Sequence, residues 1–223
     1  NGLGAPRWTD WPDRSLKATR AYAGDLQGNL WRFNLSHNNA GQWSATKLFT
    51  AQDPGGNPQP ITSAPVLALD EDGDNIMVAF GTGSYFRVED GGSPGNQVQT
   101  IYGLVDTNSL ISGRNQLLKQ EIVAQGSHTT GGKSYTLRRI SDYDLQSNHR
   151  GWYIDLSWIT GERVISGPTL PRGFNEQRVR FTTMIPDEDP CGTGRRGFLM
   201  ELNLFSGSRP DRVIFDLNED GEF

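Results

Sequence analysis

The chain has 223 residues, a net charge of −5, and many glycines (27) and prolines (12), a composition typical of one turn-rich β domain or of part of a larger one. Lysine and arginine are scattered, so the basic stripe that nucleic-acid binding requires is missing from the sequence. No apolar run approaches the ~20 residues of a membrane-spanning helix, and no membrane insertion is expected in this segment.

The first predicted elements form a β-hairpin. Residues 21–24 are a strand of mostly small residues, Asp25 and Gly28 mark a tight turn, and residues 30–35 form an aromatic strand. Asp25 begins the turn, where its carboxylate can accept hydrogen bonds from the backbone amides that follow. A small inner strand, a turn aspartate and an aromatic outer strand are typical of propeller blades.

Short strands are predicted along the rest of the chain. Helical periodicity is nearly absent, and its best candidate, residues 117–124, is also compatible with a strand. Short strands with glycine-rich connections indicate a sandwich, a barrel or a propeller. The predicted strands are residues 47–50, 64–69, 76–81, 99–105, 119–123, 134–139, 151–156, 163–166, 178–183, 197–203 and 212–215.

Internal repetition favours the propeller. The sequence Ser-Ala-Pro-Val-Leu at residues 63–67 is echoed by Ser-Gly-Pro-Thr-Leu at residues 166–170. An aromatic and aliphatic strand phrase recurs at residues 31–35, 102–106, 152–156 and 198–202. The last three copies lie roughly 45 to 50 residues apart, which is close to the period of a propeller blade. The sequence therefore predicts an all-β, propeller-like domain over residues 1–223, with three to four blades.

Long polar insertions and large aromatic residues give two further expectations. The insertions at residues 51–58, 89–96, 126–133 and 142–149 are predicted to be rim loops, and such loops usually carry binding. Five aromatic side chains are predicted to be buried between blades: Trp31, Phe33, Phe80, Trp152 and Phe181.

The acidic tail is the first candidate metal site. Asp216, Asn218 and Asp220 place oxygen-bearing side chains at alternate positions, and Gly221 follows them. This pattern matches the first half of an EF-hand calcium loop, in which Glu222 would donate its backbone carbonyl. The sequence given ends before the last ligand positions of such a loop, so a solvated acidic tail is the alternative.

A second acidic cluster contains Asp70, Asp72 and Asp74. Carboxylates this close in sequence repel one another unless a cation or water screens them, so calcium is a candidate ligand here too. The cluster also lies between two predicted strands, where a polar hairpin turn is ordinary.

No catalytic residues are predicted. The three histidines, His37, His128 and His149, have no metal-ligand spacing, and Cys191 is the only cysteine in the sequence. The sequence around Gly81-Thr82-Gly83-Ser84 does not form the nucleophile elbow of a hydrolase. A quinoprotein-like or glycan-binding propeller that acts on a small ligand is the alternative to a purely structural and binding role.

The ordered set of phrases resembles the C-terminal propeller domain of the PilY family of type IV pilus biogenesis and tip-adhesin proteins. Matching phrases run through nearly the whole chain. They are Tyr-Ala-Gly-Asp at residues 22–25, Gln-Pro-Ile-Thr-Ser-Ala-Pro at 59–65, Phe-Gly-Thr-Gly at 80–83, Ile-Tyr-Gly-Leu-Val-Asp at 101–106, Gly-Trp-Tyr-Ile-Asp-Leu at 151–156, Phe-Thr-Thr-Met-Ile-Pro at 181–186, and Gly-Phe-Leu-Met-Glu-Leu at 197–202.

The resemblance implies a non-enzymatic type IV pilus assembly factor and tip-associated adhesin that supports pilus extension and surface attachment. It implies pilus subunits or minor pilins as partners, with a host or abiotic surface as a further one. It also implies export to the pilus tip, the cell surface or the outer membrane, and possible calcium binding. Three or four blades are fewer than the complete ring of the family, so further blades are expected outside this sequence.

Overall fold

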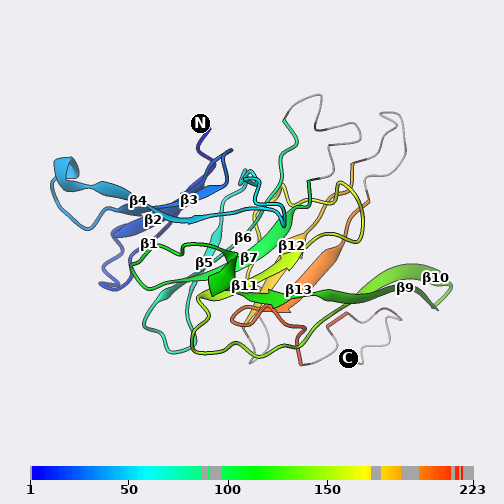
Figure 1. Cartoon of the computed structure of the whole chain (residues 1–223). Coiled ribbons are helices and arrows are strands. Elements are labelled where there is room, and N and C mark those ends of the chain that lie inside the picture. Colours follow the sequence, from blue (N-terminus) through cyan, green and yellow to red (C-terminus); the bar gives the residue numbers. More distant parts are fainter. Residues whose placement is uncertain are drawn as a thin grey trace.

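The computed structural model describes residues 2–86, 90, 97–171, 177–186, 196–211, 214–215 and 217. These residues form strands and two single-turn 3-10 helices, η1 (Ala40–Gln42) and η3 (Arg114–Gln116). The predicted all-β class is confirmed (Figure 1). Within the described ranges, no helix has the length and apolar character needed to cross a membrane.

The first sheet contains the predicted hairpin. Its four strands run in sequence order, and each pairs antiparallel with the next. The hairpin turn at Asp25 lies between the second and third strands. The strands are β1 (Arg7–Thr9), β2 (Arg20–Gly24), β3 (Asn29–Asn34) and β4 (Ser44–Thr50).

The second sheet has five strands in the order β5-β6-β7-β11-β8. They are β5 (Val66–Leu69), β6 (Ile76–Gly81), β7 (Thr100–Asp106), β8 (Leu118–Gln120) and β11 (Gly151–Asp155). All neighbours are antiparallel except β8 and β11, which are parallel.

This topology corrects one reading of the sequence repeat. The phrases at residues 102–106 and 152–156 were expected to mark successive blades, but β7 and β11 are hydrogen-bonded neighbours in one sheet. After β7 the chain forms η3, then β8 at the edge of the same sheet, then a long hairpin, and it returns as β11 between β7 and β8. The sequence separation of the two phrases is therefore the length of the segment between β7 and β11 and not the period of a blade.

The third sheet pairs β12 (Arg178–Thr182) with β13 (Leu199–Asn203). Thr169 forms an isolated bridge to Arg180 of β12, as Val66 pairs with β6 in the second sheet. The echo between residues 63–67 and 166–170 therefore reflects equivalent places in two sheets. With the first two, this sheet brings the number of blade-like sheets in the described residues to three, within the expected range.

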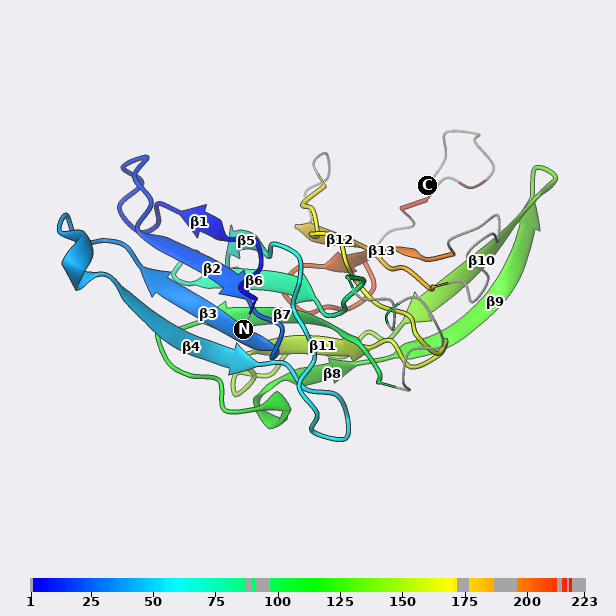
Figure 2. The same cartoon turned by 90° about the horizontal axis from the view of Figure 1, so that it is seen from above.

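A long β-hairpin replaces one predicted rim loop. Strands β9 (Ile122–Thr130) and β10 (Lys133–Ile140) form a separate two-stranded sheet, so the expectation of a loop at residues 126–133 is wrong. Gly131 and Gly132 have φ values of +55° and +75°, and two successive positive φ angles close the tight turn whose twist matches that of the strands. The hairpin extends away from the three sheets at the opposite end from the β3–β4 hairpin (Figures 1 and 2).

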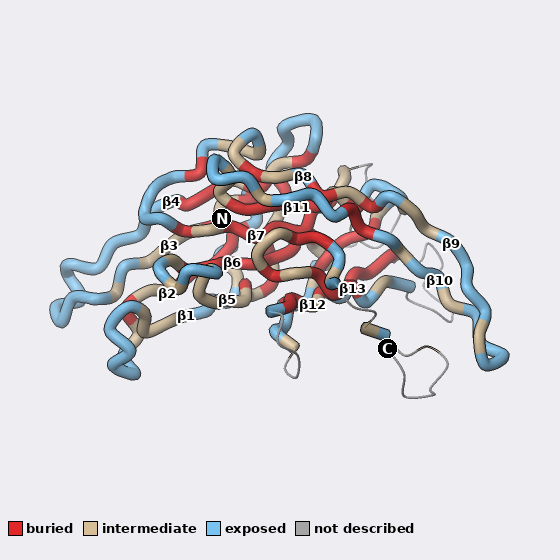
Figure 3. Tube along the Cα trace, turned by 90° about the horizontal axis from the view of Figure 1, so that it is seen from below, coloured by how far each residue is buried: buried red, intermediate tan, exposed pale blue. Residues whose placement is uncertain are grey.

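The hydrophobic core has two layers, one on each face of the second sheet. Successive side chains of a strand point to opposite faces. Met77 and Ala79 of β6 accordingly pack toward the third sheet, whereas Val78 and Phe80 pack toward the first. Every residue of β6 is buried, which explains why its sequence is a continuous apolar run and not an alternating one. Figure 3 shows the buried residues gathered in the middle of the molecule and the exposed hairpins at its ends.

The five aromatic residues predicted to be buried divide into two groups. Phe80, Trp152 and Phe181 are fully buried, as expected. Trp31 and Phe33 are only half-buried, so that expectation is wrong for them. Their strand β3 lies in the first sheet, whose core-facing side chains include Tyr22 and Leu30. Trp31 and Phe33 alternate with Leu30 along β3 and therefore point toward the opposite face.

Candidate functional site: a cleft between the first two sheets

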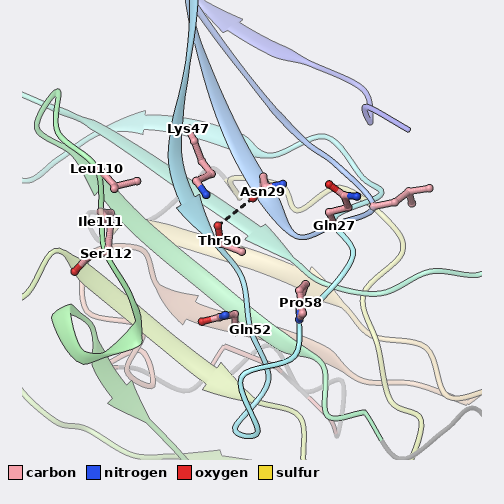
Figure 4. Close-up of a pocket in the computed structure, with 10 residues that line it drawn as sticks. Gln27, Asn29, Lys47, Thr50, Gln52, Pro58, Leu110, Ile111 and Ser112 are labelled. Atoms are coloured by element: carbon pink, nitrogen blue, oxygen red, sulfur yellow. Dashed lines mark hydrogen bonds between the residues drawn. The ribbon is translucent and has the colours of Figure 1, made fainter. Parts of the chain in front are cut away.

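A cleft lies between the inner end of the first sheet and the loop after β7 (Figure 4). Its volume is about 670 Å³, which is in the range of small-molecule sites. Three chain segments, around residues 26–29, 47–58 and 110–112, supply its walls. The lining residues are Leu26, Gln27, Asn29, Lys47, Thr50, Gln52, Pro58, Leu110, Ile111 and Ser112.

The first wall is held by the turn at Asp25. The Asp25 carboxylate oxygen Oδ1 accepts hydrogen bonds from the backbone amides of Gln27 and Asn29, each at 2.9 Å. Its Oδ2 accepts one from the indole Nε1 of Trp31 at 2.9 Å. The role expected for Asp25 from the sequence is confirmed, and the turn fixes the positions of Leu26, Gln27 and Asn29 at the cleft.

A second aspartate turn holds the segment after β4. Asp53 Oδ1 accepts hydrogen bonds from the backbone amides of Gly55 at 2.8 Å and Asn57 at 2.9 Å. Gln52 and Pro58, which line the cleft, lie on either side of this turn and form an isolated β-bridge. Aspartate turns of the same type therefore shape two of the three walls.

Both turn aspartates have shifted acidities. Burial alone would raise the pKa of Asp25, but hydrogen bonds from Trp31 and Asn29 outweigh burial and lower the pKa below its ordinary value. Hydrogen bonds from Asn57 lower the pKa of Asp53 against burial in the same way. Because each pKa is lower in the folded state, the hydrogen bonds to these two carboxylates stabilise the fold at pH values above the ordinary pKa of aspartate. This stabilisation is lost as the pH falls through the lowered pKa.

The third wall is anchored at both of its ends. Asp106, at the end of β7, accepts hydrogen bonds from the Tyr22 hydroxyl at 2.8 Å and the Arg32 guanidinium at 2.7 Å, and so ties β7 to the first sheet. Further along, the amide of buried Ile111 donates to the carbonyl of Leu48 in β4 at 2.8 Å. The loop therefore continues the edge of the first sheet and closes the cleft.

The chemistry of the lining suits binding. Carboxamide and hydroxyl groups come from Gln27, Asn29, Gln52, Thr50 and Ser112, and none of the lining side chains is acidic. Thr50 Oγ1 donates to Asn29 Oδ1 at 3.0 Å, which orients both groups toward the cleft (Figure 4). A polar lining of this kind can hydrogen-bond a ligand without reacting with it.

One ammonium group and two exposed leucines complete the lining. Lys47 supplies the single positive charge among these residues. Leu26 is 39% exposed and Leu110 is 53% exposed, so both present apolar surface at the cleft. Together they would favour a ligand with an apolar part and a neutral or anionic polar part.

A second, more polar hollow of about 460 Å³ shares Gln52 with the cleft. Here Arg114 donates to the carbonyl of Gln52 at 3.0 Å, pairs with Asp155, and stacks over the ring of Tyr153 at 4.0 Å from its centroid. Asp155 also accepts a hydrogen bond from the Thr100 hydroxyl at 2.8 Å. This network fixes the segment after β4, which carries Gln52 of the cleft, against β7 and β11.

The acidic cluster predicted as a metal site forms a turn of the same type. Asp70 Oδ1 accepts hydrogen bonds from the amides of Asp74 at 2.8 Å and Asn75 at 3.0 Å, and Oδ2 accepts one from the Asn75 side chain at 2.7 Å. In the described part of the chain, no three His, Cys, Asp or Glu side chains are placed to hold a metal ion. The structure therefore does not bring the carboxylates of Asp70, Asp72 and Asp74 together at a common metal position.

The tail residues predicted to bind calcium, Asp216, Asn218, Asp220 and Glu222, lie outside the described residues, and so does Cys191. The cleft itself was not predicted from the sequence. The turn at Asp25 and the strand containing Lys47 were expected, but no sequence signal indicates that residues 110–112 meet β4. The insertion at 51–58 was predicted as a rim loop, and that loop does contribute Gln52 and Pro58.

Comparisons with known proteins agree with the fold. Residues 1–126 match the family model of the PilY1 beta-propeller domain. The chain is 37% identical over 217 residues to a type IV pilus biogenesis factor PilY1 homolog of Xylella fastidiosa, covering 95% of this chain and 17% of that protein. It is 32% identical over 259 residues to the type IV pilus biogenesis factor PilY1 of Pseudomonas aeruginosa, covering 99% of this chain and 22% of that protein.

A solved structure supports the same family assignment. The crystal structure of the Pseudomonas aeruginosa PilY1 C-terminal domain matches with a TM-score of 0.85 and 28% sequence identity, covering 99% of this chain and 50% of that chain. The chain spans about a fifth of the length of these curated relatives. Because the family model matches more than half of the chain and the structural match covers nearly all of it, the chain belongs to the PilY1 β-propeller domain family.

Proposed function

We propose that the protein containing this chain acts in type IV pilus biogenesis, and that this part is a binding scaffold without a catalytic role. The relatives that the chain matches are named type IV pilus biogenesis factors, which supports the role in pilus biogenesis. The cleft supports the role as a binding scaffold, since its lining offers amides, hydroxyls, one ammonium group and alkyl surface. This set binds a ligand by hydrogen bonds and apolar contact and has no nucleophile paired with a base.

The partners that fit this role are pilus subunits or minor pilins, with a host or abiotic surface as a second target. The protein would then be exported and would act at the pilus tip or the cell surface, where it supports extension, twitching motility and attachment. The network of Arg114, Asp155 and Tyr153 supports such a role, because it holds Gln52 in the cleft wall and a preorganised site loses little entropy on binding.

Deleting the gene in its own organism tests the proposal. We expect the deletion strain to lose nearly all surface pili, counted by electron microscopy, and we expect the full-length gene to restore them. A strain that lacks the gene and carries wild-type numbers of pili would contradict the role in biogenesis. Loss of surface attachment with normal piliation would leave adhesion as the function.

We also propose that the tail at Asp216, Asn218 and Asp220 binds calcium in the intact protein. Alternating hard oxygen ligands followed by Gly221 suit calcium better than a softer metal. Affinity is expected at about 10⁻⁴–10⁻³ M, as in extracellular modules.

Calcium at millimolar concentration should raise the Tm of the intact protein, because the ion binds only the folded loop. The double substitution Asp216→Ala and Asp220→Ala should abolish this rise and leave the Tm without calcium unchanged. Differential scanning calorimetry with calcium or chelator measures both effects. A Tm that is indifferent to calcium would leave these residues as a solvated tail.

A further inference from the structure

The β9–β10 hairpin differs in charge from the rest of the molecule. We refer to residues 122–140 as the arm. The whole chain has a net charge of −5, yet the arm contains no Asp or Glu and carries Lys133, Arg138 and Arg139. Most of its residues are exposed. A basic element on an acidic molecule favours a partner surface with negative charge.

The base of the arm is fixed to the body by a buried ion pair. Arg138 donates two hydrogen bonds to the carboxylate of Glu162, at 2.6 and 2.7 Å, and both side chains are almost fully buried. The Arg138 guanidinium also lies over the ring of Phe198 at 3.4 Å from its centroid, and its Nε donates to Gln125 at 2.8 Å. An isolated hairpin is marginal in water, so these contacts hold the arm in one direction.

Both edges of the arm lack a neighbouring strand in the described part of the chain. Exposed edges invite pairing with another strand, and proteins commonly block them with proline or closely spaced charges. Between Ala124 and Leu137 the arm has no proline, and Lys133 beside the turn is its one Lys or Arg. At ~3.3 Å per residue the strands are roughly 30 Å long. The arm therefore retains the features that permit strand addition.

The register shows which amides point outward. Thr130 and Lys133 flank the two-residue turn and form the inner hydrogen-bonded pair. Because hydrogen-bonded pairs alternate along an antiparallel ladder, the amide of Ser127 in β9 and the amide of Thr136 in β10 point away from the partner strand. These two residues are opposite each other in the register. Each therefore places an outward-pointing amide at the same distance from the turn, one on each edge of the arm.

The number of charges argues against a polyanion or a membrane. Each Lys or Arg near an anionic membrane contributes only about 1 kcal/mol, and recognition of lipid headgroups by clustered basic residues uses 4–8 of them. Of the three basic side chains in the arm, Arg138 is already neutralised by Glu162. A second copy of the chain is disfavoured as well, because paired arms would place like charges together.

We propose that the arm docks another protein by adding to an exposed edge strand of that protein, with acidic side chains of the partner strand close to Arg139. Backbone hydrogen bonds along the edge would supply affinity, and the charge of the arm would select the partner. The proposal stands on the arm alone and does not depend on the role in pilus biogenesis.

The test uses the full-length protein and two blocked strand peptides of alternating valine and threonine. One peptide carries a glutamate at each end and the other carries lysines. Fluorescence polarisation measures Kd at several salt concentrations. We expect the glutamate peptide to bind at least about tenfold more tightly than the lysine peptide and to weaken with salt. Arg139→Glu should reverse the preference, whereas Arg139→Lys should retain it.

Two proline variants identify the edge. Ser127→Pro blocks the β9 edge and Thr136→Pro blocks the β10 edge, and both spare the hydrogen bonds inside the arm. We expect one variant to lose binding about tenfold and the other to bind like the wild type, with equal circular dichroism and Tm. The proposal is overturned if the glutamate peptide does not bind at millimolar concentration, or if both variants bind it like the wild type. Stronger binding to anionic vesicles, or self-association that Ser127→Pro or Thr136→Pro abolishes, would also overturn it by assigning the arm to a lipid or to a second copy.

Discussion

Replacing Trp152 with alanine is expected to lower the free energy of unfolding by roughly 3–5 kcal/mol. Its side chain is completely buried between the second and third sheets. The indole packs directly over Gly103, where an added Cβ would lie 2.4 Å from the ring, and over Gly207, where it would lie 2.2 Å away. Its Nε1 also donates to the carbonyl of Leu204 at 3.0 Å. The alanine variant would leave a large cavity and an unpaired buried carbonyl.

Urea unfolding followed by far-ultraviolet circular dichroism measures this loss. Trp158→Ala is the matched control, because Trp158 is 48% exposed and its removal should change the free energy of unfolding by no more than about 0.5 kcal/mol. Equal effects of the two substitutions would show that Trp152 does not join the sheets as described.

Replacing Arg138 with methionine should destabilise the fold by about 3–5 kcal/mol. The side chain of Glu162 is fully buried, and Arg138 provides its neutralising charge through two short hydrogen bonds. Removing one partner of such a pair leaves an uncompensated charge in the interior. The same change would also loosen the base of the arm.

Two controls separate the buried charge from other effects of this substitution. Lys119→Met removes a pair of similar length, 2.6 Å, between Lys119 and Glu121, but that pair is 49% and 43% exposed, so the cost should stay below about 1 kcal/mol. The double variant Arg138→Met with Glu162→Leu should recover most of the loss, because no charge remains buried. Chemical denaturation of all three proteins measures these differences. If the single Arg138→Met variant is no less stable than Lys119→Met, the buried Glu162 carboxylate does not depend on Arg138 for its neutralisation.

The local features of the fold could be predicted from the sequence. The hairpin around Asp25 follows from turn chemistry, because the carboxylate of the aspartate satisfies backbone amides that lie next to it in sequence. Strand β6 follows from its uninterrupted apolar residues, since a strand covered on both faces needs no polar alternation. Both arguments depend only on residues close together in the chain.

Features set by distant pairing could not be predicted. The placement of β11 beside β7 depends on where the chain returns after forty-odd residues, for which one sequence carries no signal. The strands of the arm were predicted only in part, because their serine, threonine and glycine residues lack the alternation of a half-buried strand. The cleft likewise depends on Ile111 meeting Leu48, which are far apart in sequence.

We propose that the propeller binds its partner in the cleft between its first two sheets, and a charge reversal in the cleft tests this proposal. Lys47→Glu places a negative charge among lining residues that include no acid, and Lys17→Glu makes the same change at an exposed residue outside the lining. Each variant of the full-length gene is introduced into the deletion strain, and surface pili are counted at equal protein level and equal Tm. We predict wild-type numbers for Lys17→Glu and numbers close to those of the deletion strain for Lys47→Glu. Wild-type numbers of pili with Lys47→Glu would contradict the proposal.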